Sequence, residues 1–186
     1  ESKDDEFDVP SIVYRKCHDG SLITYKIIKK MGKGGFGVVY SAIENPTGNK
    51  VALKCTPKSK LQNTKAKQKL LNEMTIHKSL NHPNIVKFLG VFHDKLFVYC
   101  ILELCEGGDV LQFLKSSSIT VERNDSNTEN EPPKPVPYLS ENETVRIITQ
   151  ILKSLLYLHE NAKIIHRDIK LQNFLISKSG FYTLHN

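Results

Sequence analysis

The chain has 186 residues, of which 39% are hydrophobic and 25% charged, and its formal net charge is +6. This composition excludes a disordered or fibrous chain and allows one ordinary domain with a hydrophobic core. No apolar run approaches the roughly 18 residues that span a bilayer, and the acidic start ESKDDEFD does not resemble a signal peptide. We therefore expect a soluble intracellular, cytoplasmic protein. The first residue is not methionine, which suggests a natural N-terminus further upstream.

The positive charge is concentrated in one stretch of the chain. Its seven lysines are Lys50, Lys54, Lys58, Lys60, Lys65, Lys67 and Lys69. We interpret them as a solvated helix face rather than a nucleic-acid surface, because no aromatic residue lies between them to stack on bases. The cysteines show neither a Cys-x-x-Cys pair nor zinc-type spacing to histidine, which predicts free thiols in a reducing compartment. They are Cys17, Cys55, Cys100 and Cys105.

The first predicted region, residues 22–105, is a lobe of five antiparallel strands and one main helix, preceded by an acidic and then mixed leader over residues 1–21. Three β-rich segments lie at 21–31, 37–44 and 50–55, separated by a glycine-rich turn and by the turn residues NPTGN. The composition then becomes helix-forming, and a proline in the sequence NHPN ends the predicted helix. The apolar runs IVKFLGVF and LFVYCILEL complete the five strands.

That helix is predicted over 63–80, because Ala66, Leu70, Met74 and His77 recur at helical intervals on one face.

The second predicted region, residues 106–186, begins at the sequence EGGD with a short helical turn and is mainly helical. Residues 116–137 are rich in Ser, Asn, Glu and Pro without periodicity, so we expect a flexible surface insertion. A long helix starts at Ser140, where Ser140 and Glu143 form a capping-box pattern. Its predicted buried face consists of Val145, Ile148, Leu152, Leu155 and His159.

Three motifs carry the chemistry. In the first, Gly32, Gly34, Gly37 and Val39 follow the order G-x-G-x-x-G-x-V. A dinucleotide-binding fingerprint would open a helix, whereas a β-forming segment follows here. A strand–turn–strand hairpin of this kind can lay backbone amides over a polyphosphate, although a merely tight hairpin remains an alternative.

The second motif is a lysine on the third predicted strand. Lys54 is costly to bury without a partner, and Glu73 on the predicted helix offers one. A Lys54–Glu73 pair would hold the ammonium toward the α- and β-phosphates of ATP, and a structural salt bridge is the alternative.

The third motif, HRDIKLQN at residues 166–173, is the most specific. Asp168 can accept a proton from the hydroxyl that receives the phosphate, and Lys170 can neutralise charge on the transferred group. Asn173 can coordinate Mg²⁺.

With these motifs the chain resembles the eukaryotic protein kinases over roughly residues 25–186. The resemblance implies an α+β protein-kinase-like fold, with a five-stranded N-lobe followed by an incomplete helical C-lobe. It also implies ATP and Mg²⁺ as cofactors and protein Ser/Thr as substrates, the last from Lys170. The catalytic set would be Asp168, Lys170, Lys54 and Glu73, and the glycine-loop contacts to ATP would come from Met31, Gly32, Lys33, Gly34, Gly35, Phe36, Gly37 and Val39.

The same resemblance implies the rest of the ATP site. Leu102 would be the gatekeeper, and Glu103 and Cys105 would flank the adenine through backbone groups. Asp109 would face the ribose. Ala52 and Leu175 would sandwich the adenine together with Val39.

Within the superfamily, the segments PKSKL, NEMTIHKSLNHPNIV, FVYCILELC and LSENET resemble polo-like kinases most. That resemblance adds the centrosome or nucleus to the locations we expect.

One expected metal ligand is absent. In kinases the aspartate of the D-F-G motif lies about thirteen positions beyond the catalytic-loop asparagine, and Asn186, the last residue, stands there. We therefore expect an incomplete kinase domain that, as written, transfers phosphate negligibly. The alternative is a natural, catalytically inactive module that binds nucleotide or a partner protein, the partner covering an exposed helix at 140–159. Neither reading implies nucleic acid or membrane as a partner.

Overall fold

The computed structural model describes residues 8–35, 37–120, 135–137, 139–180 and 182–184. The chain forms two compact units. The first comprises residues 1–81 and 86–104, and the second comprises residues 82–85 and 105–186. The boundary after Leu104 lies one residue before the boundary that the sequence analysis places at Cys105.

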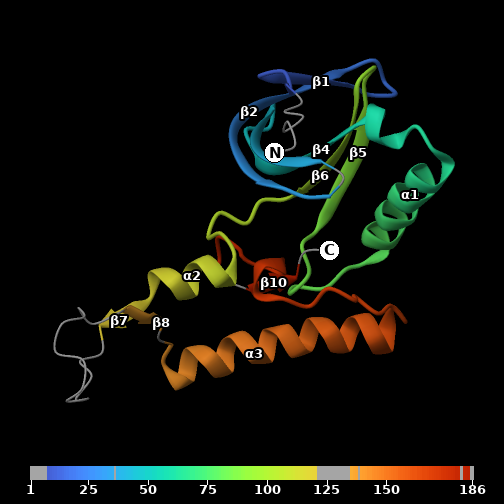
Figure 1. Ribbon diagram of the computed structural model, residues 1–186. Helices are drawn as coiled ribbons and strands as arrows, with labels where there is room; N and C mark the ends of the chain where they lie inside the picture. The colour runs from blue at the N-terminus through green and yellow to red at the C-terminus, as the bar shows by residue number, and fades with distance from the viewer. Residues whose placement is uncertain (1–7, 36, 121–134, 138, 181, 185–186) are drawn as a thin grey trace, which may run out of the picture. The chain divides into compact units, whose positions relative to one another are not determined.

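The first unit is built on one antiparallel sheet with the strand order β1-β2-β3-β4-β6-β5. Figure 1 shows this sheet curled, with α1 beside it. The strands are β1 (Ile12–Lys16), β2 (Leu22–Lys33), β3 (Val38–Asn45), β4 (Lys50–Pro57), β5 (Phe88–His93) and β6 (Phe97–Glu103).

The five predicted strands are all present, and part of the predicted leader adds a sixth strand, β1. β1 pairs antiparallel with β2, and Val13 lies opposite Tyr25. The connecting turn is closed by a hydrogen bond from the Cys17 amide to the Ser21 carbonyl (2.8 Å) and uses Gly20 at φ +83°. The acidic residues before this segment concealed a short β-rich run that ends in an Asp-Gly turn.

The core of the first unit lies on the concave face of the curled sheet. Strand residues alternate between the two faces, so residues two apart on β4 and on β6 enter this cluster together. Tyr25 and Phe92 stack with their ring centroids 5.3 Å apart, and Phe92 and Tyr99 stack at 4.8 Å. The buried members are Val13, Tyr25, Ala42, Val51, Leu53, Cys55, Phe97, Tyr99 and Ile101.

The predicted helix is α1 (Thr64–Ser79), preceded by the 3₁₀ turn Lys58–Leu61. The Asn63 side chain caps α1 by accepting a hydrogen bond from the Ala66 amide (2.6 Å). Leu70 and His77 are its buried residues, as the periodicity predicts. His77 Nε2 lies 2.7 Å from the Val86 carbonyl oxygen, and burial lowers the pKa of this imidazole, so it remains neutral and donates that hydrogen bond.

The second unit contains two helices, α2 (Val110–Ser116) and α3 (Glu141–Leu156), and a turn of π-helix at Tyr157–Asn161. A 3₁₀ turn, Leu171–Asn173, leads into the β9–β10 hairpin (Phe174–Ile176 and Tyr182–Leu184). In the predicted insertion, β7 (Ser118–Thr120) pairs with β8 (Pro135–Pro137), a ladder that the sequence analysis did not expect. Residues 121–134 lie outside the described residues.

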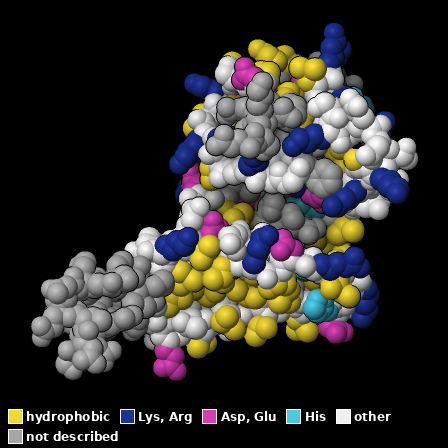
Figure 2. Space-filling view, in the orientation of Figure 1, with side chains coloured by type: hydrophobic (Ala, Val, Ile, Leu, Met, Phe, Trp, Pro, Cys, Tyr) yellow, Lys and Arg dark blue, Asp and Glu magenta, His cyan; other side chains and the backbone are white. Residues whose placement is uncertain are grey.

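The α3 helix buries a different face from the predicted one. Ser140 caps it as expected, accepting from the Glu143 amide at 3.2 Å. Ile147, Ile151 and Ser154 are its buried residues, and α3 contacts β10. Val145, Ile148 and Leu152 are 58%, 48% and 58% exposed, because α3 carries two apolar stripes and only one is covered among the described residues. Hydrophobic side chains accordingly gather along the outer surface of the second unit (Figure 2).

None of the helices in the described part of the chain combines the length and apolar character needed to cross a membrane.

The inclusion of β1 in the core predicts a position-specific effect on stability. Val13 is 3% exposed and Tyr14 is 56% exposed. We expect Val13→Asp to lower the free energy of unfolding by at least about 3 kcal/mol, because it buries an unpaired charge. The matched variant Tyr14→Asp costs about 1 kcal/mol, the scale of β-propensity differences. Chemical denaturation measures both, and equal small losses would mean that residues 12–16 are not part of the folded core.

Candidate active site

The glycine-rich segment joins β2 to β3 and is closed by a hydrogen bond from the Gly34 amide to the Gly37 carbonyl (2.8 Å). A Cβ atom built on Gly32 or Gly35 would meet nothing within 4 Å. A Cβ atom on Gly34 would meet only the Gly37 carbonyl oxygen, at 3.9 Å. The described residues therefore leave open space beside these three glycines.

Gly37 is different from the other glycines of the loop. A Cβ atom there would lie 2.1 Å from the Cys55 carbonyl oxygen and 2.9 Å from its carbon. The turn therefore needs glycine at position 37 for the close approach of its backbone to β4.

Several predicted adenine-site residues of the first unit share one face of the sheet. In the ladders, Val39 lies opposite Lys54 and Ala52 opposite Leu102. Residues opposite one another point to the same side, and this side is opposite to the core because Leu53 and Val51 point inward. The register thus brings Val39, Ala52, Lys54 and Leu102 together.

The side chain of Lys54 on β4 forms an ion pair with Glu73 on α1, the pair that the sequence predicts. The two side chains are 14% and 23% exposed, so the pair is largely shielded from water. The hydrogen bond fixes the ammonium on the sheet face that carries Val39 and Ala52.

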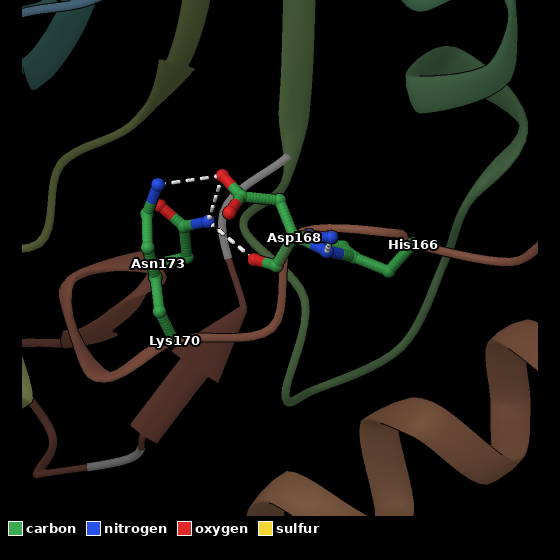
Figure 3. A network of polar contacts seen from close by, with 4 residues as sticks. All are labelled: His166, Asp168, Lys170 and Asn173. Carbon is green, nitrogen blue, oxygen red and sulfur yellow. Dashed lines mark hydrogen bonds and ion pairs between the residues drawn. The ribbon is translucent and has the colours of Figure 1, made fainter.

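In the second unit, the segment HRDIKLQN folds into a compact polar loop around one carboxylate (Figure 3). Lys170 Nζ donates to Asp168 Oδ2 at 2.7 Å. Asn173 Nδ2 donates to the Asp168 carbonyl oxygen at 2.7 Å and to Oδ2 at 3.0 Å. The 3₁₀ turn places Asn173 next to Asp168 because it reverses the chain directly after Lys170.

These contacts lower the pKa of Asp168, chiefly through the hydrogen bond from Lys170 and then through that from Asn173. Asp168 is therefore an ionised carboxylate at neutral pH. Its side chain is 62% exposed, so a molecule in solution can reach it.

The backbone before Asp168 contributes to this geometry. Arg167 adopts φ +68°, which is unusual for a residue other than glycine. The Asp168 amide donates to Nδ1 of His166 at 3.3 Å. The sequence analysis quoted His166 within the motif without giving it a role, and its place in the H-R-D order was the available signal.

Three other predicted residues belong to the second unit. Asp109 caps α2 by accepting from the Gln112 amide at 2.9 Å, and it forms a β-bridge with Leu175. The Cys105 thiol lies 3.3 Å from Thr183 Oγ1. The backbone at Gly107 packs closely on Ile176 of β9. A Cβ atom at position 107 would lie 2.7 Å from the Ile176 side chain, so this approach requires glycine. The sequence analysis missed both that close approach and the capping role of Asp109.

The remaining predicted contacts are distributed as follows. Met31 is 41% exposed on β2, beside the exposed Gly32 and Lys33. Glu103 ends β6 and, being opposite Val51, directs its side chain to the core side of the sheet rather than to the Lys54 side. Phe36 and Asn186 lie outside the described residues. The assigned roles of all these residues in binding remain predictions.

Comparison with known proteins identifies the family. Residues 25–185 match the family described as protein kinase domain. The chain belongs to this family. Strand β1 precedes the matched region.

Curated relatives of this kinase chain agree with its resemblance to polo-like kinases. A probable serine/threonine-protein kinase PLK of Dictyostelium discoideum is 37% identical over 178 residues, which cover 94% of this chain and 16% of that protein. Serine/threonine-protein kinase PLK4 of Xenopus tropicalis is 36% identical over 153 residues (82% and 14%). Serine/threonine-protein kinase polo of Drosophila melanogaster is 37% identical over 155 residues (83% and 23%). The chain thus spans 14 to 23% of the length of these relatives.

The donor set of the catalytic loop fits part of a magnesium site. Mg²⁺ is usually held by one or two carboxylates or amide oxygens together with substrate phosphates. Since Asn173 donates through Nδ2, its Oδ1 remains as the ligand atom. The described residues contain no group of three or more His, Cys, Asp or Glu side chains that could hold a metal on its own.

The crowded Gly37 and the unobstructed Gly35 should differ in how much an alanine substitution changes stability. Gly37→Ala places its methyl group against the Cys55 carbonyl, so we expect the free energy of unfolding to fall by about 1–3 kcal/mol. Gly35→Ala has open space and changes stability by less than about 1 kcal/mol. Thermal unfolding of both variants tests this, and an undisturbed Gly37→Ala protein would contradict the close packing of the loop on β4.

The lowered pKa of Asp168 also gives a prediction. We expect Lys170→Met to raise that pKa toward its ordinary value, because the largest cause of the shift is lost. Since the pKa is lowered in the fold, these contacts stabilise the loop at neutral pH and are lost as the pH falls through it. A ¹³C-carboxyl NMR titration measures the pKa. Lys163→Met, whose ammonium pairs with Glu160, is the control and should leave the Asp168 titration unchanged.

Proposed function

We propose that the protein is an ATP-dependent protein kinase that transfers a phosphoryl group to serine or threonine of protein substrates. The observation that carries this proposal is the Asp168 carboxylate, ionised, accessible and held by Lys170 and Asn173. The relatives named above are serine/threonine-protein kinases, which supports the choice of acceptor.

The role proposed for Asp168 follows from its hydrogen bonds. Lys170 and Asn173 both donate to Oδ2, so Oδ1 is left to accept the proton of a substrate hydroxyl and to orient its oxygen. Lys170, already beside that carboxylate, neutralises negative charge that develops on the transferred group.

ATP, when bound, supplies the phosphoryl group, and Mg²⁺ supplies charge neutralisation between its phosphates. Residues of the first unit would hold the nucleotide. The glycine turn, which has open space beside Gly32 and Gly35, would bind phosphate oxygens through backbone amides other than that of Gly34. The Lys54 ammonium, fixed by Glu73, would bind the α- and β-phosphates. Ala52 and Val39, on the same sheet face, would contact the adenine.

A non-catalytic, partner-binding kinase-like module is the second candidate. The observation that favours it is the exposed apolar stripe of α3, in which Leu152 and Leu156 are 58% and 62% exposed. Such a module needs no ionised Asp168, so substitutions at this residue separate the two candidates.

For the protein at its natural length, we expect Asp168→Asn to reduce phosphorylation of casein by about 10²–10⁴-fold, because the proton acceptor is lost. Lys54→Met should reduce it comparably, and the exposed Lys65→Met, on α1, should not. The assay measures transfer from Mg-ATP with phosphoamino-acid analysis, which should give phosphoserine and phosphothreonine. Thermal unfolding of each variant separates lost chemistry from lost structure.

Two results would contradict the proposed function. Phosphorylation that persists in a folded Asp168→Asn protein would remove Asp168 from the chemistry. A natural-length protein that transfers no phosphate to any substrate tested, although it binds a partner protein, would favour the second candidate.

A further inference from the structure

The open end of the curled sheet in the first unit contains a pocket of about 450 Å³. It is lined by residues from five of the six strands, together with Asn49, Lys87 and Leu104. We call this site the sheet-end pocket. Its volume lies in the range of small-molecule sites, about 300–1,000 Å³, which often occupy the mouths of β-barrels.

One wall of the pocket comes from β1, the strand that precedes the region matched to the kinase family, through Arg15. Arg15 of β1 approaches β5 from across the curled sheet, so that its Nη1 lies 3.8 Å from where a Cβ atom on Gly90 would stand. β1 and β5 are the two edge strands of the sheet, and Arg15 brings a side chain of one close to the backbone of the other.

A β-bulge supplies the apolar wall opposite Arg15. In the β5–β6 ladder the register shifts between Phe88 and Gly90, and Leu89 is the extra residue. Bulges redirect side chains, and Leu89 lines the pocket while remaining 47% exposed. Val51 and Ile101, both buried members of the core cluster, form the adjoining apolar wall.

The charges on the wall favour an anion. Arg15, Lys50 and Lys87 contribute three positive charges, and Glu44 and Glu103 contribute two negative charges. Both carboxylates already accept hydrogen bonds from other groups of the protein. Glu44 accepts from Tyr25 Oη (2.8 Å) and Thr47 Oγ1 (2.7 Å), and Glu103 accepts from the Lys87 amide (3.2 Å).

Arg15 retains donors for a ligand. Arg15 uses Nη1 in one long hydrogen bond to Tyr25 Oη (3.5 Å), and a guanidinium carries five N–H donors. The excess of one positive charge fits a monoanion better than a dianion, which the two carboxylates would repel.

We propose that the sheet-end pocket binds a small amphipathic monocarboxylate, whose carboxylate is bound by Arg15 and whose branched apolar body contacts Leu89, Val51 and Ile101. Apart from Glu103, whose backbone is assigned to the adenine site, the residues of the sheet-end pocket are not among those assigned to phosphoryl transfer, and the proposal does not depend on the proposed function.

The test is an NMR titration of the ¹⁵N-labelled full chain with 4-methylpentanoate, the neutral 4-methylpentanamide and acetate. We expect saturable shifts at the backbone amides of Arg15, Leu89 and Glu103 with 4-methylpentanoate, at the millimolar affinity that a probe of this size reaches. The amide lacks the charge and acetate lacks the apolar body, so each should bind at least about tenfold more weakly.

Two matched pairs of variants assign the site. Arg15→Met should weaken binding of 4-methylpentanoate by about tenfold or more, because a charge-assisted hydrogen bond is lost. Lys16→Met, the exposed neighbour on the opposite face of β1, should not. Leu89→Trp should fill the pocket and abolish binding, and Leu96→Trp, at a position 67% exposed, should leave it unchanged.

The proposal is overturned by any of three results: shifts that do not saturate or lie away from the pocket, equal binding of the amide, or unchanged binding in both Arg15→Met and Leu89→Trp. If Arg15→Met fails to fold, the Leu89→Trp and Leu96→Trp pair decides alone, since both positions are exposed and the substitutions leave the core intact.

Discussion

The alternation of side chains along β4 is the constraint on which the first unit depends. Val51, Leu53 and Cys55 enter the core, and Ala52 and Lys54 between them point to the other face. A slip of one residue would exchange the two sets, placing an ammonium in the core and removing it from Glu73. Burial of the core residues therefore fixes the register, and the register fixes where the lysine lies. The register of β4 therefore determines both the packing of the core and the position of the Lys54 ammonium.

The loop around Asp168 in the second unit is held together mainly by interactions between residues close in sequence. The carboxylate of Asp168 is held by residues two and five positions later in the chain, so a short loop assembles the group with little help from distant packing. Arg167 adopts an unfavourable positive φ, and Nδ1 of His166 accepts a hydrogen bond from the Asp168 amide. The sequence of such a loop largely specifies its geometry, so the motif can be recognised from the sequence alone. Hydrophobic packing of β9, β10 and α3 then serves as its support.

Features that short stretches of sequence encode could be predicted, whereas features that depend on tertiary contacts could not. The glycine turn and the strands β2 to β6 were predictable, because strand periodicity and turn residues encode them locally. The Lys54–Glu73 pair was predictable because a lysine on a buried strand needs a partner, which Glu73 on the predicted helix offers. Strand β1 was not, since its residues become a strand only by pairing with β2 and burying Val13. The buried face of α3 was also wrong, because two apolar stripes have equal periodicity and only tertiary contact selects one. The capping role of Asp109 and the close approach at Gly107 required coordinates.

We propose that the Lys54–Glu73 pair holds an ammonium for ATP, and a double-mutant cycle provides the test. ATP affinity would be measured by calorimetry for the unmodified chain, Lys54→Met, Glu73→Gln and the double variant. The account predicts that each single change weakens binding and that the double variant binds no more weakly than Lys54→Met, because Glu73 acts only through the lysine. Glu73→Gln binding as tightly as the unmodified chain, or losses that simply add, would contradict it.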